Sequence, residues 1–168
     1  MESFTPVIVF HALAALFVLI LGPFQILRRR HDRAHRILGA SWVGAMLAVC
    51  ISSFWINDGT FSWLHGLAIW TLLCMVFAIA GIRRRNVSVH RGFMVGSYLG
   101  TLAAFTFAAL IPQRLIPRLL TSQPVVAIGT TLAVAAAVVV WFFAITRSTS
   151  RPDRTPAGVS AGEGGVRA

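Results

Sequence analysis

Residues 5–27 read TPVIVFHALAALFVLILGPFQIL, an almost unbroken apolar run that ends at Arg28, Arg29 and Arg30. An α-helix needs about 20 apolar residues to cross roughly 30 Å of hydrocarbon, and it satisfies its own backbone hydrogen bonds there. Four further stretches reach that length: residues 37–56, 61–82, 92–111 and 124–146. The sequence therefore predicts an all-α integral membrane protein with five membrane-spanning helices.

The composition of the 168 residues supports this fold class. Hydrophobic residues make up 57% and charged residues 12%, whereas an average soluble domain has about 45–50% and about 25%. Too few polar side chains remain to cover a soluble globule, so most soluble-enzyme folds are excluded. The acidic residues stand in predicted loops or termini. No carboxylate is therefore placed within a span to act as a general base in hydrolysis.

The basic charge indicates an orientation in the membrane. All 15 basic residues are arginines, and the net charge is +10. Thirteen arginines lie in residues 28–36, in residues 83–91 or after residue 146, whereas Arg114 and Arg118 lie on the opposite side. Cytoplasmic loops carry the excess of arginine, so we expect the N-terminus outside and the C-terminus in the cytoplasm. Contact with anionic headgroups accounts for the charge, and nucleic-acid binding is not expected.

The two arginine-rich loops repeat one pattern. Residues 28–36 read RRRHDRAHR and residues 83–91 read RRRNVSVHR, so three arginines, four variable residues and His-Arg recur. His11 and His65 precede His35 and His90 by 24 and 25 residues. This self-similarity predicts two parallel hairpin repeats, 5–56 and 61–111, that form a four-helix membrane bundle within residues 1–115. Residues 116–147 add a peripheral fifth helix, and residues 148–168 are expected to be a disordered cytoplasmic tail.

This topology sorts four histidines into two pairs. His11 and His65 are expected near the outer face, and His35 and His90 at the cytoplasmic ends of the second and fourth spans. Intramembrane ionisable residues are costly and usually serve a function. Two facing imidazoles suit the iron of a b-type haem, so the sequence predicts up to two haem b groups, ligated by His11 with His65 and by His35 with His90. The predicted function is transmembrane electron transfer, a membrane oxidoreductase activity in the broad sense.

Further residues extend this haem hypothesis. Arg36 and Arg91, with the arginine triplets at 28–30 and 83–85, are expected to pair with the inner haem's propionates, because guanidinium groups suit carboxylates. Gly22 would let a ring come close to the first span. Gln25 would hydrogen-bond a quinone head or the haem edge, or instead satisfy a backbone group that Pro23 leaves free. The expected partners are the lipid bilayer, a quinone or another redox partner, and a larger membrane complex that contacts the fifth span.

Other interpretations of the same residues stay open. The histidines also suit polar contacts that only position helices, in a structural or accessory membrane subunit without catalytic activity. His11 and His65 also suit one bound metal ion, and a histidine-based metal or proton transporter is a third possibility. His31 breaks the repeat and is interpreted as a solvated loop residue. Cys50 and Cys74 lie inside apolar runs without metal or redox spacing, and we expect them to be buried.

The motifs resemble a known family. Residues 11–39, HALAALFVLILGPFQILRRRHDRAHRILG, and residues 90–98, HRGFMVGSY, resemble the bacterial membrane proteins grouped as domain of unknown function 2306. The resemblance covers about the first 115 residues, and Phe93 and Gly96 depart from the Trp and Arg that are frequent there. It implies a multi-helix protein of the bacterial cytoplasmic membrane and supplies no substrate. The histidine pairs also resemble the architecture of two-haem transmembrane cytochromes b, a likeness that does not establish function.

Overall fold

The structure is a computed structural model, and it describes residues 6–28, 32–56, 61–110 and 121–149. The regular elements of these residues are α-helices, and all five are long and apolar enough to cross a membrane. They are α1 (Pro6–Leu27), α2 (Arg33–Ser53), α3 (Trp63–Arg83), α4 (Val87–Leu110) and α6 (Pro124–Thr149). The prediction of an all-helical protein with five candidate spans is therefore confirmed. Of the predicted tail, 148–168, the first two residues belong to α6 and residues 150–168 lie outside the described part.

Capping residues explain where α2 and α4 begin. The Asp32 side chain accepts a hydrogen bond of 3.0 Å from the His35 N–H. In the same way, Asn86 Oδ1 accepts from the Val89 N–H at 3.1 Å. Such side chains satisfy backbone donors that the first turn of a helix leaves unpaired. Both helices therefore begin before the apolar stretches predicted at residues 37 and 92, and His35 and His90 lie inside them.

The α3–α4 connection is a tight turn. The Asn86 N–H donates to the Gly81 carbonyl at 2.8 Å, and Arg85 adopts the left-handed conformation with φ 59°. This is the arrangement of a Schellman helix end, in which glycine is the usual left-handed residue. Gly81 has no side chain, and a Cβ there would lie 2.9 Å from Val89 Cγ1. The absence of that atom lets α4 start directly beside the end of α3.

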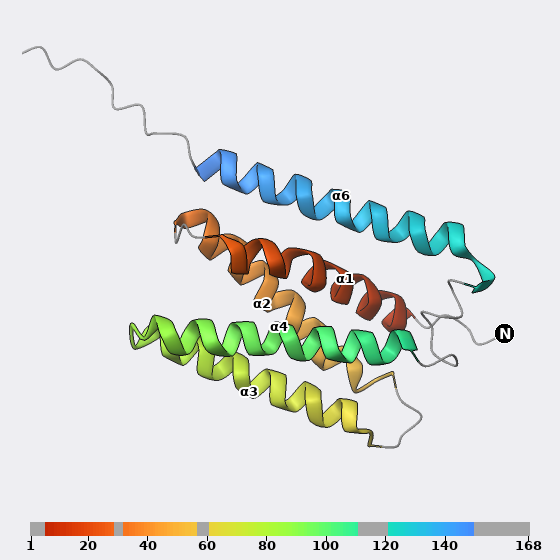
Figure 1. Ribbon diagram of the computed structural model, residues 1–168, viewed down its shortest axis with the longest axis horizontal. Coiled ribbons are helices and arrows are strands. Elements are labelled where there is room, and N and C mark those ends of the chain that lie inside the picture. The colour runs from red at the N-terminus through yellow and green to blue at the C-terminus, as the bar shows by residue number, and fades with distance from the viewer. Residues whose placement is uncertain (1–5, 29–31, 57–60, 111–120, 150–168) are drawn as a thin grey trace, which may run out of the picture.

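The helices alternate in direction and pack mainly on their neighbours. Figure 1 shows α1 and α2 as one hairpin and α3 and α4 as another. The hairpins meet where α2 packs on α3 and α1 packs on α4, and α6 lies against α1 and α2. Among the described residues, the backbones of α1 and α3 do not contact each other, and neither do those of α2 and α4. Thr101 on α4 still reaches across the interior to Met46 Sδ, at 3.4 Å.

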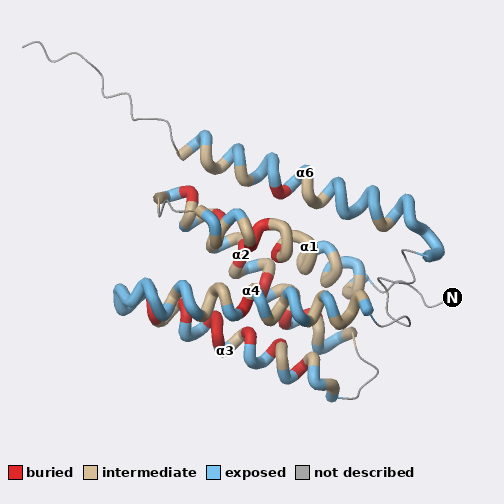
Figure 2. The backbone as a smooth tube through the Cα atoms, in the orientation of Figure 1, coloured by how far each residue is buried: buried red, intermediate tan, exposed pale blue. Residues whose placement is uncertain are grey.

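The core follows one face of α2. Leu38, Trp42, Met46 and Cys50 are spaced four residues apart and are all buried. They pack with Val18 and Leu21 of α1, Ala68 and Met75 of α3 and Val138 of α6. Figure 2 shows this burial concentrated along α2 and α3, while α4 and α6 have one buried residue each, Ser97 and Val138. The central position of α2 follows from this face, because it contacts three other helices.

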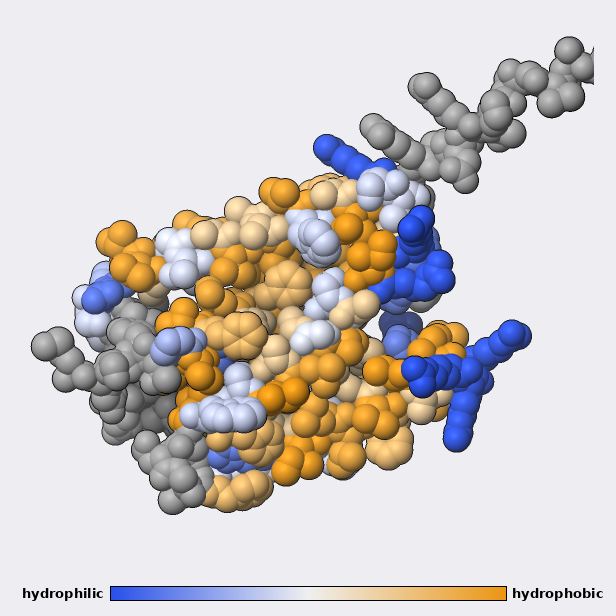
Figure 3. All heavy atoms as spheres, turned by 180° about the vertical axis from the view of Figure 1, so that it is seen from behind, coloured by the Kyte–Doolittle hydropathy of each residue, from blue (hydrophilic) through white to orange (hydrophobic). Residues whose placement is uncertain are grey.

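The outer surface is apolar around the middle of the molecule and hydrophilic at one end. Figure 3 shows the hydrophobic side chains as a broad band with the arginine-rich turns beyond it. Among the exposed side chains along the middle of α6 are Leu132 and Val140, at 64% and 67%. Soluble monomers rarely expose contiguous apolar patches of such extent, whereas hydrocarbon tails match this surface. The band is therefore the surface of a membrane protein.

Candidate functional site

The alternating helices bring the four repeated histidines to two ends of the molecule. His11 in α1 and His65 in α3 lie at the end where α2 finishes. His35 and His90 lie in the first turns of α2 and α4, at the opposite end with the arginine-rich turns. His31 lies outside the described residues. The structure thus separates the histidines into the same two groups that the sequence predicts.

His11 and His65 are both held by the last turn of α2. His11 Nδ1 lies 2.9 Å from Ser52 Oγ. His65 Nε2 lies 3.2 Å from the backbone oxygen of Ser53. Two consecutive serines therefore hold the imidazoles of two different helices, and we call these four residues the outer cluster.

Both ring nitrogens of His65 are engaged. The Ser62 N–H donates to His65 Nδ1 at 3.0 Å, so the proton sits on Nε2, which donates to the Ser53 carbonyl. The ring is buried and lies between Phe54 and Phe61, at centroid distances of 5.2 and 5.4 Å. His65 occupies the third position of α3, where a Glu or Gln would complete a capping box. The side chain therefore fixes the start of α3 against the end of α2.

His11 has a simpler environment. His11 also has a hydrogen bond with the backbone of Val49. With the Ser52 hydroxyl donating to the Val49 carbonyl at 3.1 Å, His11 Nδ1 is assigned as the donor to Ser52 Oγ. The lone pair of His11 then lies on Nε2. His90, at the other end, also donates from Nδ1, here to the Ala78 carbonyl at 3.0 Å. An imidazole that donates one N–H to an oxygen and keeps the other nitrogen free has the arrangement typical of metal-binding histidines.

A second group of polar side chains surrounds the start of α2. Gln25 Nε2 donates to the His35 carbonyl at 3.1 Å, and Arg28 pairs with Asp32 at 2.7 Å. The Arg28 guanidinium also lies 5.8 Å from the centre of the Phe142 ring, on α6. These contacts join α1, α2 and α6 at the arginine-rich end. Gln25, Arg28, Asp32 and His35 form what we call the inner cluster.

Two buried polar atoms of the inner cluster have no hydrogen-bond partner in the described part of the chain. They are Gln25 Oε1, an acceptor, and Arg28 Nε, a donor. Buried polar atoms without partners are rare, since each costs the free energy of its lost hydration. Gln25 thus keeps an unused acceptor beside its bond to α2. Arg36 and Arg91, the predicted propionate partners, are exposed on the first turns of α2 and α4.

The Asp32 carboxylate is stabilised in its ionised form. The His35 N–H and the Arg28 guanidinium both hydrogen-bond to it. These contacts, with the His35 N–H first, lower the pKa of Asp32 below its ordinary value of 3.8. The capped start of α2 therefore carries a negative charge at neutral pH, next to the Arg28 side chain.

Tyr98 and Trp42 have roles that the sequence did not reveal. Pro23 has no N–H, so the Leu19 carbonyl lacks its helical partner, and the Tyr98 hydroxyl donates to it at 3.3 Å. Trp42 Nε1 donates to the neighbouring Val18 carbonyl at 3.0 Å. Gly22 makes room, because a Cβ there would lie 2.5 Å from two Tyr98 ring carbons. The ring that Gly22 admits belongs to Tyr98, and the carbonyl freed by Pro23 is satisfied by Tyr98 and not by Gln25.

The chain matches one family profile, described as Predicted membrane protein (DUF2306), over residues 8–145. It belongs to this family. The match includes α6, so the DUF2306 resemblance extends beyond the first 115 residues in which the sequence motifs lie. No curated protein and no solved structure matches the chain.

For this DUF2306 protein, the arrangement of the described side chains limits the possible metal chemistry. No group of three or more His, Cys, Asp or Glu side chains gathers in residues 6–28, 32–56, 61–110 and 121–149. Ligation by two histidines, as in a b-type haem, needs only one imidazole from each of two helices. His11 and His90 suit this role as they stand, whereas His65 must first release the Ser53 carbonyl.

Proposed function

We propose that this protein is a transmembrane electron carrier of the b-type cytochrome kind. His11 with His65 and His35 with His90 would ligate one haem b near each membrane face. The supporting observation is that four helices each supply one histidine, two at each end, and that His11 and His65 meet on Ser52 and Ser53. The fold we propose is a four-helix bundle of two duplicated hairpins with α6 as a peripheral fifth helix.

The hydrogen bonds of His11 and His90 support ligation. Each ring donates from Nδ1 to an oxygen, which fixes its orientation and leaves Nε2 for an iron atom. Arg36 and Arg91 are exposed at the inner end, where they would pair with haem propionates. The unused Gln25 Oε1 would accept a hydrogen bond from a quinol hydroxyl. The haem would supply one-electron chemistry, and these residues would hold and orient it.

A second candidate function is that of a structural or accessory membrane subunit. The observation that favours it is the set of partners around His65, which uses both ring nitrogens to join α2 and α3. The interior is also well filled, since Trp42 and Met46 are buried and Tyr98 packs against the Gly22 backbone. In this role the histidines would only position helices.

The proposed setting is the cytoplasmic membrane of a bacterium, with the N-terminus outside and the C-terminus in the cytoplasm. The excess of arginine at the inner end of the hairpins supports this orientation. The proposed partners are anionic lipid headgroups, a quinone or another redox protein, and a larger membrane complex that contacts the exposed face of α6.

Visible spectra distinguish the two functions. Protein purified in mild detergent from cells supplied with haem should give a reduced-minus-oxidised band of haem b. His11→Ala and His35→Ala should each remove about half of that band, because each removes one of two bis-histidine sites. His31→Ala, outside the proposed ligand set, is the matched control and should leave the band unchanged.

Absence of a haem band from the wild-type protein would refute the electron-carrier proposal. The accessory function then makes its own prediction. His65→Ala should lower the thermal unfolding midpoint, because it leaves the part-buried Ser53 carbonyl and the Ser62 N–H without their partner. His31→Ala should not lower it. Zinc or copper that copurifies without haem would favour metal binding instead.

A further inference from the structure

The two arginine-rich turns have diverged. Arg28 and Arg83 are equivalent in the repeat, each seven residues before its histidine. The Arg28 side chain is 13% exposed and is paired with Asp32. In the second repeat Val87 takes the place of Asp32, and Asp32 is the one acidic residue in the described ranges. Arg83 and Arg84 are exposed and face no carboxylate within those ranges.

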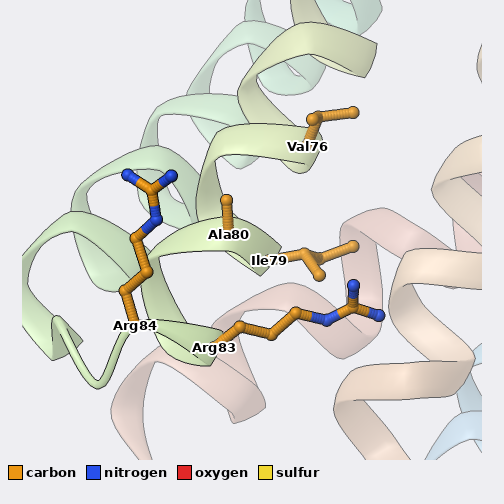
Figure 4. Close-up of a pocket in the computed structure, with 5 residues that line it drawn as sticks. All are labelled: Val76, Ile79, Ala80, Arg83 and Arg84. Atoms are coloured by element: carbon orange, nitrogen blue, oxygen red, sulfur yellow. The ribbon is translucent and has the colours of Figure 1, made fainter.

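Two apolar hollows adjoin these free arginines. The first has a volume of about 320 Å³ and is lined by Val76, Ile79, Ala80, Arg83 and Arg84. The second, of about 250 Å³, lies between α3 and α4 and includes Phe77, Phe93, Ala80 and Arg84. Ala80 and Arg84 border both hollows. Figure 4 shows the Arg83 and Arg84 side chains extending to either side of Ala80.

We propose that the end of α3 is a binding site for an anionic phospholipid. The exposed guanidinium groups of Arg83 and Arg84, which extend to either side of Ala80, turn toward each other to hold the headgroup phosphate between them, and the acyl chains lie in the two hollows. None of its residues is one of the four histidines proposed to ligate haem, so phospholipid binding at this site does not require haem.

The positive charge of Arg83 and Arg84 and the apolar walls of the two hollows together favour a phospholipid as the ligand. Guanidinium groups suit phosphate oxygens, and basic pockets at the ends of membrane helices bind anionic headgroups. A free phosphate would use only the arginines and would gain nothing from apolar walls. Val76 and Phe77, in those walls, are 62% and 52% exposed and face the surroundings of the helices. A molecule with a phosphate at one end and hydrocarbon at the other matches both parts.

The first test compares charge removal at two places on the same end of the molecule. The full chain is reconstituted in bilayers of phosphatidylglycerol and phosphatidylcholine with identical acyl chains, and retained lipids are measured by native mass spectrometry. The double variant Arg83→Gln/Arg84→Gln should retain about tenfold less phosphatidylglycerol than the wild type. Arg33→Gln/Arg147→Gln removes two exposed arginines elsewhere and should retain it normally. Equal losses in both variants would overturn the proposal in favour of diffuse attraction.

The second test separates a lipid from a free anion. Ala80→Phe fills the wall that both hollows share and changes no charge, so it should lower phosphatidylglycerol retention several-fold. Retention unchanged in Ala80→Phe, together with competition by soluble glycerophosphate, would overturn the phospholipid site and indicate a free anion. Ala80→Leu repeats the test with a smaller side chain in case the Phe variant does not fold. Because the readout is lipid mass, failure of the haem proposal does not affect it.

Discussion

Pro23 removes one backbone donor from the C-terminal part of α1, and Tyr98 supplies a replacement from α4. In hydrocarbon no water is available to satisfy the freed Leu19 carbonyl, so a donor from another helix is needed. The Tyr98 hydroxyl reaches it at 3.3 Å, and Gly22 leaves the space that the ring requires. Pro23, Tyr98 and Gly22 thus join the two hairpins at one point: Pro23 frees the carbonyl, Tyr98 donates to it, and Gly22 makes room for the Tyr98 ring.

Tyr98→Phe should destabilise the protein only where Pro23 is present. Loss of the hydroxyl should cost about 0.6–1.7 kcal/mol, the range of interhelical hydrogen bonds in membranes. Pro23→Ala restores an N–H that bonds the Leu19 carbonyl within α1, so Tyr98→Phe should cost little in that background. Unfolding free energies of the four proteins in detergent, arranged as a double-mutant cycle, measure this coupling. Equal costs in both backgrounds would contradict it.

The sequence marks Gly22 as a place where a ring comes close, but it does not show which ring. Helical periodicity gives the face on which a residue lies, while the partner depends on how the two hairpins pack. The same holds for the histidines. The loop charges predict at which end of the molecule each histidine pair lies. The hydrogen bonds of His11 with Ser52 and of His65 with Ser53, in contrast, depend on how α2 packs against α1 and α3.

At the scale of single helices, the sequence predicts how many helices there are and that they alternate in direction. It does not predict the residues at which α2 and α4 begin. Apolar stretches that begin at residues 37 and 92 omit the polar first turns of α2 and α4. Asp32 and Asn86 are residues of the type that caps helices, and their capping bonds place the true starts at Arg33 and Val87. The position of the cap therefore decides whether His35 and His90 belong to a loop or to a helix.

The cap of α2 predicts a pH dependence of stability. Because the folded state lowers the pKa of Asp32, its ionised form contributes stability above the ordinary value of 3.8. That contribution is lost as the pH falls through the lower folded-state pKa. Asp32→Asn keeps a capping side chain but loses the charge that pairs with Arg28.

The thermal midpoint of wild type should therefore exceed that of Asp32→Asn at neutral pH, and the two should converge in acid. Midpoints measured in detergent between neutral pH and about pH 2.5 test this, since the ordinary carboxyl pKa lies within that range. The remaining carboxylates are common to both proteins and cancel in the comparison. A difference that stays constant down to the lowest pH would show that Asp32 acts only as a neutral cap.

At the scale of the whole molecule, the two arginine-rich turns share a sequence pattern but differ in their chemistry. In the first turn, Arg28 contacts Asp32 and the Phe142 ring, so it connects α6 to the first hairpin. The second turn lacks the carboxylate and leaves Arg83 and Arg84 exposed beside apolar hollows. The arginine spacing is the same in the two turns and does not show that Arg28 is paired while Arg83 faces no carboxylate within the described residues. That difference arises because Val87 stands where the first turn has Asp32.

The orientation of the whole molecule is also testable at its two ends. Thirteen arginines on one side predict that the turn between α3 and α4 is cytoplasmic and that the start of α3 is outside. Phe61 is 73% exposed at the end opposite the arginine-rich turns, and Ser88 is exposed at the α3–α4 turn. Cys50 and Cys74 are buried, so the native protein should give little labelling of its own.

In spheroplasts, Phe61→Cys should react with a membrane-impermeant maleimide, and Ser88→Cys should react only after the membrane is opened. Inverted vesicles should reverse this order, which excludes differences in intrinsic thiol reactivity as the cause. Ser88→Cys labelled from outside would reverse the orientation and would put the arginine-rich turns on the outer face. The excess of arginine would then need an explanation other than topology, because the positive-inside bias would point the wrong way.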